Sequence, residues 1–255
     1  MLHERRNQIV ERITASRMVK VADLMRDFHV SIETIRRDLE FLEDQGYLRR
    51  VYGGAVLRGA YGLEPSYEHR EVINLAEKQA IAVKTAELID DEDTLFIDLG
   101  TTTLEVTRCL GAKKNLTVIT NATLIAQAAV SFGFRVIMLG GELRRGELAV
   151  SGFLCESAMQ NFFVNKLIMG VGGITLEGGV TDYNIEEANA RRRMLERADT
   201  VIAVADYSKF GVTALNSICS VGKINMLISD ATLPSKTLAE YKAAGVKIIT
   251  APLLK

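Results

Sequence analysis

The chain has 255 residues, a formal net charge of −1 and 48% hydrophobic residues, a composition that is typical of a globular protein and excludes a disordered, collagen-like or coiled-coil chain. A net charge near zero would argue against nucleic-acid binding, which needs clustered Lys and Arg, but the charge is unevenly distributed. Residues 1–60 carry 11 Lys and Arg against 9 Asp and Glu, and ten of these cations are Arg, whereas the other 195 residues carry 20 against 23.

A helical pattern of apolar residues runs through the first 46 residues. Their three- and four-residue spacing predicts a first helix over residues 5–15 and a second over residues 21–28. Ser31 is a favourable N-cap for a third helix, which is expected to end near Gly46. The polar face of this third helix consists of Glu33, Arg36, Arg37 and Glu40.

Two short helices joined by a tight turn, the second with arginines in its first turns, are the arrangement by which a helix-turn-helix reads DNA. Residues 47–54 are predicted to form a hairpin wing, in which Arg49 and Arg50 could hold flanking phosphates. Arg is the side chain preferred for bidentate contacts to phosphate and guanine. These features predict a winged helix-turn-helix domain at residues 1–57.

Two alternatives stay open for this segment. Glu33 with Arg37, and Arg36 with Glu40, have the spacing of ion pairs along a helix, so the polar face of the third helix could simply be solvated. The other alternative is a winged helix that binds a protein and not DNA, which predicts little or no salt dependence of binding to duplex DNA.

The same segment resembles a known signature. Arg5, Ile9 and Ile13, followed after 17 residues by Ser31-Ile32-Glu33-Thr34-Ile35-Arg36-Arg37-Asp38-Leu39, resemble the helix-turn-helix of the DeoR family of bacterial transcriptional regulators. Residues 49–55 are similar to the wing of that family. The resemblance implies a regulator, by the habit of the family a repressor of a carbohydrate-utilisation operon. It also implies a set of DNA-binding residues: Arg5, Ser31, Thr34, Arg36, Arg37, Arg49 and Arg50.

Four glycines and one proline between residues 53 and 65 predict a turn and then a linker over residues 58–75. Beyond it, short β-branched segments alternate with helical patterns, which predicts a larger, Rossmann-like α/β domain with a parallel sheet over residues 76–255. Because each segment is almost continuously apolar, the strands are expected to be buried on both faces. The predicted strands are 94–98, 116–120, 135–139, 166–171, 200–205, 225–229 and 246–250.

Glycine and polar residues follow several of these strands. The carboxyl ends of the strands of an open α/β sheet form its ligand crevice, and a helix N-terminus at that edge favours an anion. The pattern predicts a small polar ligand with phosphate and hydroxyl groups. The residues concerned are Asp98, Gly100, Thr101, Thr102, Thr103, Asn121, Gly141, Gly172, Gly173, Asp206 and Lys209. For the threonines the alternative is an ordinary helix cap, and for Lys209 it is an ion pair with Asp206.

This half of the chain is similar to the effector domain of the DeoR family, whose fold is similar to that of ribose-5-phosphate isomerase. The similarity is carried by Asp98–Thr103, Val118–Asn121 and Asp206–Gly211. It implies that Gly100 and Thr101–Thr103 bind the phosphate of a small phosphorylated sugar and that Lys209 faces this ligand. Asp182 and Glu186 complete the expected effector-binding set.

The isomerases carry Asp-Gly-Ala-Asp-Glu near their fourth strand, where this chain has Gly170-Val171-Gly172-Gly173-Ile174 without a carboxylate. Acid–base catalysis needs a positioned carboxylate, so a sensor and not an enzyme is expected. Glu186 and Glu187, followed by Arg191–Arg193, either bind hydroxyls or form a helix N-terminal turn with a solvated basic patch. An active sugar-phosphate isomerase-like enzyme fused to a helix-turn-helix is the alternative, and it predicts turnover of pentose or hexose phosphates.

Cys109, Cys155 and Cys219 are widely separated, which predicts free thiols in a reducing compartment and neither a metal nor a cofactor. Charged residues interrupt the N-terminus, and no run reaches the ~18–20 apolar residues of a membrane span. We therefore expect a cytoplasmic protein without a membrane partner. The expected partners are double-stranded operator DNA, a phosphorylated sugar and further copies of the chain, in a homodimer or homotetramer.

Overall fold

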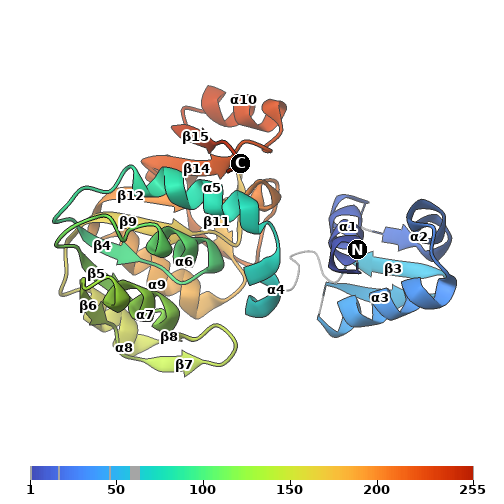
Figure 1. Cartoon of the computed structure of the whole chain (residues 1–255), viewed down its shortest axis with the longest axis horizontal. Coiled ribbons are helices and arrows are strands. Elements are labelled where there is room, and N and C mark those ends of the chain that lie inside the picture. Colours follow the sequence, from blue (N-terminus) through green and yellow to red (C-terminus); the bar gives the residue numbers. More distant parts are fainter. Residues whose placement is uncertain (1, 17, 46, 58–63, 255) are drawn as a thin grey trace. The chain divides into compact units, whose positions relative to one another are not determined.

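The computed structural model describes residues 2–16, 18–45, 47–57 and 64–254 (Figure 1). The chain divides into two compact units, Met1–His69 and Arg70–Lys255. One cluster of buried apolar side chains lies in the first unit and two lie in the second. Because each unit has its own core, each is a domain in the physical sense.

The N-terminal unit is a winged helix with three helices and a small antiparallel sheet in the order β1-β3-β2. The three predicted helices and the predicted hairpin are confirmed, and a short strand between the first two helices was not predicted. The elements are α1 (Leu2–Ser16), β1 (Met18–Lys20), α2 (Val21–Phe28), α3 (Ile32–Asp44), β2 (Leu48–Val51) and β3 (Gly54–Leu57).

Fully buried aliphatic side chains hold these helices together. Ile9 and Ile13 of α1 pack in one cluster with Leu24 of α2 and Leu39 of α3. Burying one such side chain stabilises the folded state by about 1.5–3 kcal/mol. Between α2 and α3, His29 adopts a left-handed backbone (φ 52°), which turns the chain sharply from one helix into the next.

The C-terminal unit is built on a seven-stranded sheet in the order β15-β14-β12-β9-β4-β5-β6, in which every neighbouring pair is parallel. All seven strands predicted from the sequence are present, within two residues at each end. They are β4 (Thr94–Ile97), β5 (Thr117–Thr120), β6 (Arg135–Met138), β9 (Val164–Gly170), β12 (Ala198–Val204), β14 (Met226–Asp230) and β15 (Ile248–Ala251).

Helices cover both faces of this sheet, as the near-continuous apolar strands predicted. One core packs α5 (Leu75–Ala86), α6 (Thr101–Arg108) and α7 (Thr123–Ser131) on the sheet. The core of the opposite face contains side chains of α8 (Phe153–Met159), α9 (Ile185–Leu195) and α10 (Ser235–Ala243). Successive residues alternate between the two cores: Phe96 of β4 belongs to one, and Leu95 and Ile97 belong to the other.

Several short elements of this unit were not predicted. A hairpin joins β7 (Glu142–Arg144) to β8 (Ala149–Ser151). A second antiparallel sheet has the order β10-β11-β13, formed by β10 (Gly173–Thr175), β11 (Gly179–Asp182) and β13 (Asn216–Cys219). The single turns η1 (Tyr207–Lys209) and η2 (Val221–Lys223) complete the unit. With only three or four residues per strand, these segments carry too little periodicity to be recognised in the sequence.

The predicted linker contains a helix. Helix α4 (Tyr67–Val72) lies inside the predicted span of residues 58–75 and is followed almost at once by α5. Residues 58–63 of this span lie outside the described residues. The glycine-rich segment is therefore followed by ordered helical chain before the sheet begins.

The strand order creates a topological switch point. The chain passes from β4 through β5 to β6 at one edge, returns to β9 on the other side of β4, and then builds β12, β14 and β15 outward. Connections leave β4 and β9 in opposite directions, so the carboxyl ends of these two strands lie where an open α/β sheet binds its ligand.

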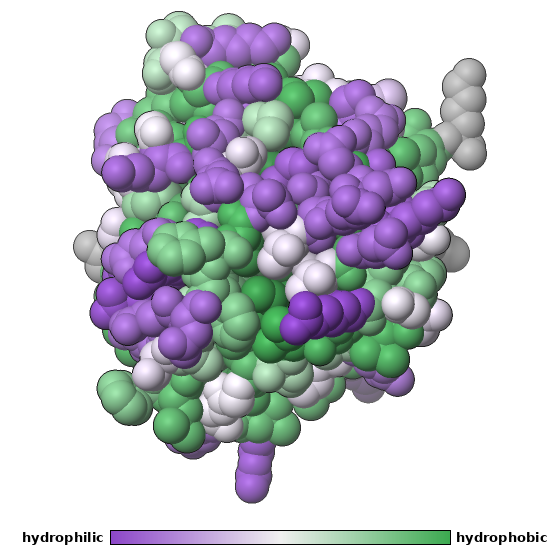
Figure 2. All heavy atoms as spheres, turned by 90° about the vertical axis from the view of Figure 1, so that its left-hand side faces the viewer, coloured by the Kyte–Doolittle hydropathy of each residue, from purple (hydrophilic) through white to green (hydrophobic). Residues whose placement is uncertain are grey.

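One face of the molecule is shown by hydropathy in Figure 2. Hydrophilic side chains predominate in its upper half, and hydrophobic ones are more frequent in the centre and lower half. The second unit has several exposed apolar side chains. They include Val130 near the end of α7, and Phe153 and Leu154 in the first turn of α8, with Phe153 82% exposed. A large apolar share of the surface is ordinary in folded proteins.

Candidate functional site

The first turn of α3 has the predicted cap. The Ser31 Oγ accepts a hydrogen bond from the backbone N–H of Thr34 at 3.3 Å, and the two hydroxyl oxygens lie 3.1 Å apart. The cap satisfies one of the free amides at the helix start. The cap thereby fixes Ser31 and Thr34 at the N-terminal end of α3. A recognition helix contacts base edges with the residues at this end.

Arg36 and Arg37 extend from α3 into solvent. Among the described side chains neither forms an ion pair, so the two helical pairs that would neutralise this face are not formed. Glu40 lies instead 3.7 Å from Arg50. Two unpaired guanidinium groups on one exposed helix face are suited to phosphate and base contacts.

Arg5 has a different position from the one predicted for a DNA-binding residue. Its Nε donates to Asp38 at 2.6 Å, and the Nε of Arg6 donates to the other oxygen of the same carboxylate at 2.8 Å. The Arg5 side chain is only 15% exposed, and Asp38 is buried. Arg5 therefore fixes α1 to α3, because a buried carboxylate needs its partners. Asp38 was missed, although its place on the apolar stripe beside Leu39 could have indicated a buried ion pair.

The wing is attached to α3 through Arg50. Its backbone N–H and its Nε donate to the carboxylate of Glu43 at 2.8 and 2.6 Å. This pairing raises the pKa of Arg50 further, with the Glu43 hydrogen bond as the main cause. Arg50 thus orients the hairpin as well as presenting charge. The side chain of Arg49 lies outside the described residues.

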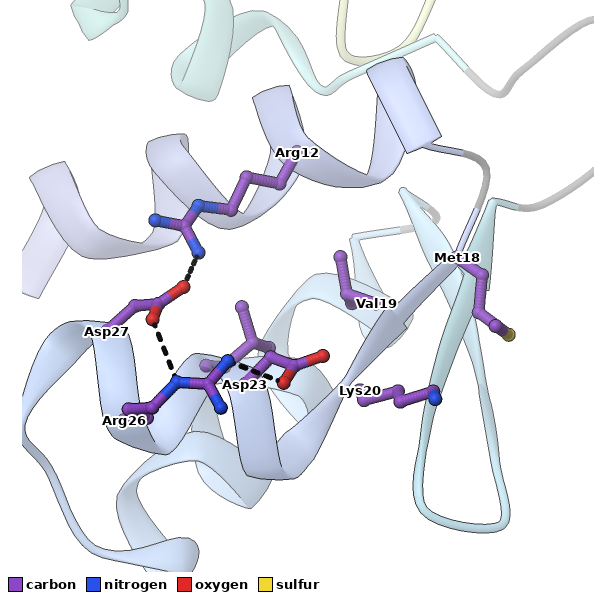
Figure 3. Close-up of a pocket in the computed structure, with 8 residues that line it drawn as sticks. Arg12, Met18, Val19, Lys20, Asp23, Arg26 and Asp27 are labelled. Atoms are coloured by element: carbon purple, nitrogen blue, oxygen red, sulfur yellow. Dashed lines mark hydrogen bonds and ion pairs between the residues drawn. The ribbon is translucent and has the colours of Figure 1, made fainter.

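A hollow of about 550 Å³ lies in this unit between α1, β1 and α2 (Figure 3). Four of its charged side chains form pairs, Arg12 with Asp27 and Arg26 with Asp23 at 2.8 Å, and Lys20 is the fifth charged residue of the lining. The hydrogen bond from Arg12 lowers the pKa of Asp27. Two carboxylates and two guanidinium groups of the lining are therefore already satisfied within the unit.

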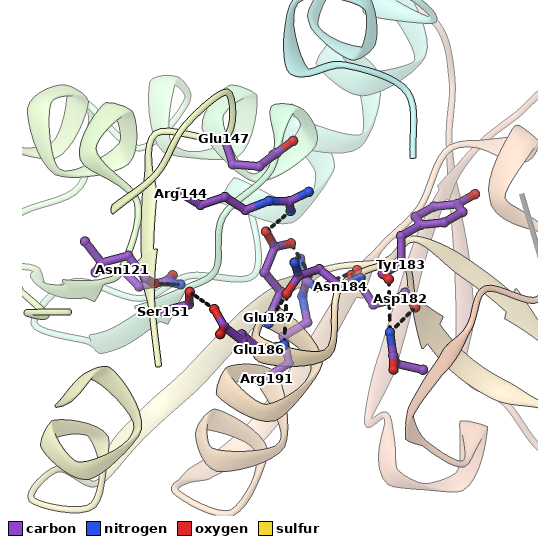
Figure 4. Close-up of polar contacts among 12 residues, drawn as sticks. Asn121, Arg144, Glu147, Ser151, Asp182, Tyr183, Asn184, Glu186, Glu187 and Arg191 are labelled. Carbon is purple, nitrogen blue, oxygen red and sulfur yellow. Dashed lines mark hydrogen bonds and ion pairs between the residues drawn. The ribbon is translucent and has the colours of Figure 1, made fainter. Parts of the chain in front are cut away.

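In the second unit, charged residues gather at the carboxyl ends of the strands. We call Asp98, Asn121, Arg144, Ser151, Asp182, Glu186, Glu187 and Arg191 the carboxyl-edge cluster; Figure 4 labels all of these residues except Asp98, which pairs with Arg191. At its centre the buried Arg191 donates from Nε to Asp98 and from Nη1 to Asp182, both at 2.5 Å. The alternative of a solvated basic patch over Arg191–Arg193 is therefore wrong for Arg191, which is buried and forms internal ion pairs.

Burial and charge oppose each other at this centre. Burial raises the pKa of Asp98 to about 6, against the lowering effect of Arg191, and Asp182 raises it further. Burial lowers the pKa of Arg191, but the carboxylates of Asp182, Asp98 and Glu187 outweigh it, and the net shift is upward. Arg191 therefore stays charged, and Asp98 is mostly ionised at neutral pH.

Buried acceptors of the cluster for which the described residues supply no hydrogen-bond donor include two at the ends of neighbouring strands. These two are the Oδ1 of Asp98, at the end of β4, and the Oδ1 of Asn121, at the end of the neighbouring β5. The other Asp98 oxygen accepts from Arg191, and the Asn121 Nδ2 donates to the carbonyl of Val150 at 3.0 Å. An unsatisfied buried acceptor costs about 1–3 kcal/mol, so both oxygens favour a donor from a ligand.

The Gly-Thr-Thr-Thr segment forms the start of α6, as predicted. Gly100 is the N-cap residue, and the Thr103 Oγ1 donates to its carbonyl at 2.9 Å. Thr101 and Thr103 are buried, and Thr102 is half-buried. The first amides of a helix have no acceptor within the helix, so this turn can present N–H groups to an anion.

Among the predicted glycines, several lie so close to neighbouring backbone that a larger side chain would collide with it. A Cβ on Gly141, whose φ is +152°, would lie 2.5 Å from the carbonyl oxygen of Ser151. Gly172 donates its N–H to the carbonyl of Thr181 at 3.1 Å, and Gly173 begins β10. Because these residues have no side chain, the β7–β8 hairpin and the small sheet can approach the carboxyl edge closely.

The two glutamates of α9 have separate surroundings. Ser151 Oγ donates to the exposed Glu186 at 2.8 Å, and Arg144 pairs with the buried Glu187. Asn184 caps the helix by accepting the amides of both glutamates. Arg144 and Ser151 both come from the unpredicted β7–β8 hairpin, which is why the sequence did not indicate them.

Asp206 and Lys209 lie after β12. Asp206 is buried and accepts hydrogen bonds from the Ser208 amide and from Asn74 Nδ2, both at 3.0 Å. No ion pair between Lys209 and Asp206 is found among the described side chains, so the alternative assigned to Lys209 is not formed. Lys209 keeps its ammonium group available at the edge of the sheet.

The described part of the chain holds no group of three His, Cys, Asp or Glu side chains that could bind a metal. The three cysteines are free thiols, and burial raises the pKa of Cys155 to about 12 and that of Cys219 to about 11. Such thiols are poor nucleophiles. No described helix combines the length and the apolar composition that crossing a membrane requires.

Comparison with known families matches both units. Residues 5–59 match the DeoR-like helix-turn-helix domain, and residues 73–231 match the DeoR C-terminal sensor domain. Together these matches account for most of the chain and for both of its structural units.

Similar proteins extend over almost the full length. A putative aga operon transcriptional repressor of Escherichia coli O157:H7 is 38% identical over 96% of this chain and 93% of its own. A regulator named GlpR of Haloferax volcanii is 35% identical over 96% of both chains. The glycerol-3-phosphate regulon repressor of Escherichia coli K12 is 33% identical over 91% of this chain and 92% of its own.

Solved structures are more distant. A ribose 5-phosphate isomerase A of Neisseria gonorrhoeae is 14% identical, with a TM-score of 0.39 over 53% of each chain. A probable sor operon regulator of Shigella flexneri is 12% identical, with a TM-score of 0.44 over 66% of this chain and 89% of its own.

Proposed function

Because this chain belongs to the DeoR family of transcriptional regulators, we propose that it represses a carbohydrate-utilisation operon and that a phosphorylated sugar controls its operator binding. The relatives reported above are named as regulators and repressors, not as enzymes. The isomerase alternative is therefore set aside, and the protein acts through binding.

The DNA-binding part of the proposal is supported by the exposed face of α3. Arg36 and Arg37 form no ion pair with the described residues, and Ser31 and Thr34 lie at the helix start, so α3 would enter the major groove with this face. Arg37 would then contact a guanine edge or a phosphate, and Arg50 would place the wing beside the groove. Arg5 remains a positioning residue in this account.

The effector part rests on one observation above all: no described residue donates a hydrogen bond to the buried Oδ1 atoms of Asp98 and Asn121. A sugar would supply two hydroxyl donors to them. The amides at the start of α6 and the ammonium of Lys209 would hold its phosphate, since both favour an anion. Asp182 and Glu187 would act indirectly, by orienting Arg191 and with it the Asp98 carboxylate.

Effector binding would then shift an equilibrium between arrangements with high and low operator affinity. Operators read by such domains have a symmetry that matches a protein dimer, with half-sites about 34 Å apart or a multiple of it. We propose that the C-terminal domain assembles the homodimer or homotetramer that this symmetry requires.

Thermal unfolding in the presence of sugars tests the effector class. A ligand that binds only the folded chain stabilises it by about 2.7 kcal/mol at one hundred times its Kd. We expect phosphorylated sugars, and not their unphosphorylated forms, to raise the Tm. The substitution Lys209→Gln should reduce this shift, whereas Lys236→Gln, at a position 89% exposed on α10, should leave it unchanged. A shift with unphosphorylated sugars alone would contradict the phosphate assignment.

A further inference from the structure

A buried lysine caps the helix that precedes the sheet. Lys78, on α5, is 4% exposed, and its Nζ donates to the backbone carbonyls of Arg70 and, at 2.7 Å, Ile73. These two carbonyls lie at the end of α4, where the helix has unsatisfied acceptors and a partial negative charge. Lys78 therefore holds the last turn of α4 in place.

Lys78 also interacts electrostatically with charged groups at the carboxyl edge of the sheet. The charged groups that face it are Asp206 and Lys209 after β12, Arg70 of α4 and Glu105 of α6. Glu105 lies one helical turn after Thr101, in the segment assigned to the phosphate. Lys78 is thus bonded to the end of α4 and interacts electrostatically with groups expected to hold an anion.

Two further contacts attach the segment of residues 70–78 to this edge. Arg70 pairs with Glu147, between β7 and β8, and Asn74 donates to Asp206. Two side chains of this segment are therefore bonded to residues that follow β7 and β12. The chain that precedes them runs back to the DNA-binding unit.

We propose that Lys78 couples effector binding to helix α4: an anionic group bound beside Lys209 draws the Lys78 ammonium away from the carbonyls of Arg70 and Ile73, and the last turn of α4 loosens. This inference rests on the proposed effector site and adds a residue and a route of regulation to it. An anion attracts an ammonium more strongly than a neutral carbonyl does. A helix of six residues depends on its cap and its packing, so the loss of two bonds changes its population markedly.

Hydrogen exchange of the full-length chain tests the coupling, with inorganic phosphate as the probe and chloride at equal ionic strength as the reference. In the wild-type protein, phosphate should accelerate exchange in peptides covering residues 67–78 by about tenfold. In Lys78→Gln the same peptides should exchange at that faster rate without phosphate and show no further response. Lys84→Gln, at a half-buried position of the same helix whose side chain pairs with Glu87 and not with α4, should behave as the wild type does.

The failures can be told apart. If phosphate raises the Tm but leaves exchange of residues 67–78 unchanged in the wild type, the coupling is wrong and the effector site stands. If neither phosphate nor phosphorylated sugars bind, the effector site fails. In that case, if amides of α4 exchange as slowly in Lys78→Gln as in the wild type, Lys78 does not stabilise the last turn of α4. The wild-type comparison needs no variant, so it decides the coupling even if Lys78→Gln does not fold.

Discussion

Arginine side chains of this protein serve two different purposes, and burial separates them. Arg36 and Arg37 are exposed and unpaired among the described residues, whereas Arg5, Arg6 and Arg191 each hold a buried carboxylate. The difference follows from the position of the acid. A carboxylate on an apolar face must be neutralised within the fold, and the nearest guanidinium groups are committed to it.

Removal of Arg37 tests the first purpose. Arg37→Ala should weaken specific operator binding by about 1–3 kcal/mol, because one charge-assisted contact to base or phosphate is lost. A gel-shift titration at fixed salt measures it, with Arg108→Ala as the control, since this exposed arginine on α6 carries the same charge in the other unit. Equal operator affinity of Arg37→Ala and the wild type would contradict the assignment.

Removal of Asp38 tests the second purpose. Asp38→Ala leaves Arg5 and Arg6 without their partner, so the N-terminal unit should lose about 3 kcal/mol of unfolding free energy. Urea unfolding, followed separately for the two units, measures this loss. Asp27→Ala removes a more exposed pair with Arg12 and should cost clearly less, because solvent screens this pair. A cost for Asp38→Ala no larger than this control would show that the pair contributes little.

Lys78 predicts a pH dependence of anion binding. Burial lowers its pKa to about 8, against the raising effect of Asp206, so its ammonium loses its proton between pH 7 and 9. Sulfate, whose charge is constant in this range, should bind more weakly as the pH rises, and Lys78→Gln should lose most of this dependence. The effect on stability has the opposite sign: the unfolded lysine keeps its proton to about pH 10.5, so the unfolding free energy rises above pH 8. Sulfate affinity that stays constant from pH 7 to 9 would exclude Lys78 from the site.

At the scale of elements, the sequence was sufficient wherever periodicity was long. The seven parallel strands and the three N-terminal helices could be predicted because each buries a continuous run or a stripe of apolar residues. The short strands β1, β7, β8, β10, β11 and β13 could not, because their pairing depends on close backbone approach in the finished fold. Gly54 is an example: a Cβ there would lie 2.2 Å from the carbonyl oxygen of Val19.

This contact predicts the effect of a methyl group. Gly54→Ala should separate β3 from β1 and destabilise the N-terminal unit by about 1–3 kcal/mol, as overpacking does elsewhere. Thermal unfolding measures it. The control is Gly222→Ala, where the nearest neighbouring atom lies 4.0 Å from the added Cβ and where no loss is expected. A neutral Gly54→Ala would mean that β1 can move away from β3 without cost.

At the scale of the whole molecule, the effector site combines what the sequence indicates with what only the fold provides. Asp98, Asn121 and Asp206 follow predicted strands, and that rule predicts them as members of the proposed effector site. Lys78, Arg144 and Ser151 come from a helix and a hairpin far away in sequence, and neither spacing nor composition connects them to the site. Their contribution depends on the switch point between β4 and β9, which only the strand order reveals.

The central claim is that one chain reads DNA with its first unit and senses a phosphorylated sugar with its second. The direct test is the affinity for operator DNA at fixed salt, with a duplex that has been selected from random DNA. The affinity is measured with and without a phosphorylated sugar that raises the Tm. A coupling of about 1–3 kcal/mol predicts that the sugar weakens operator binding by roughly 5- to 150-fold. If the sugar leaves operator affinity unchanged, or if the protein converts that sugar phosphate into another compound, the protein is not a sensor of this kind.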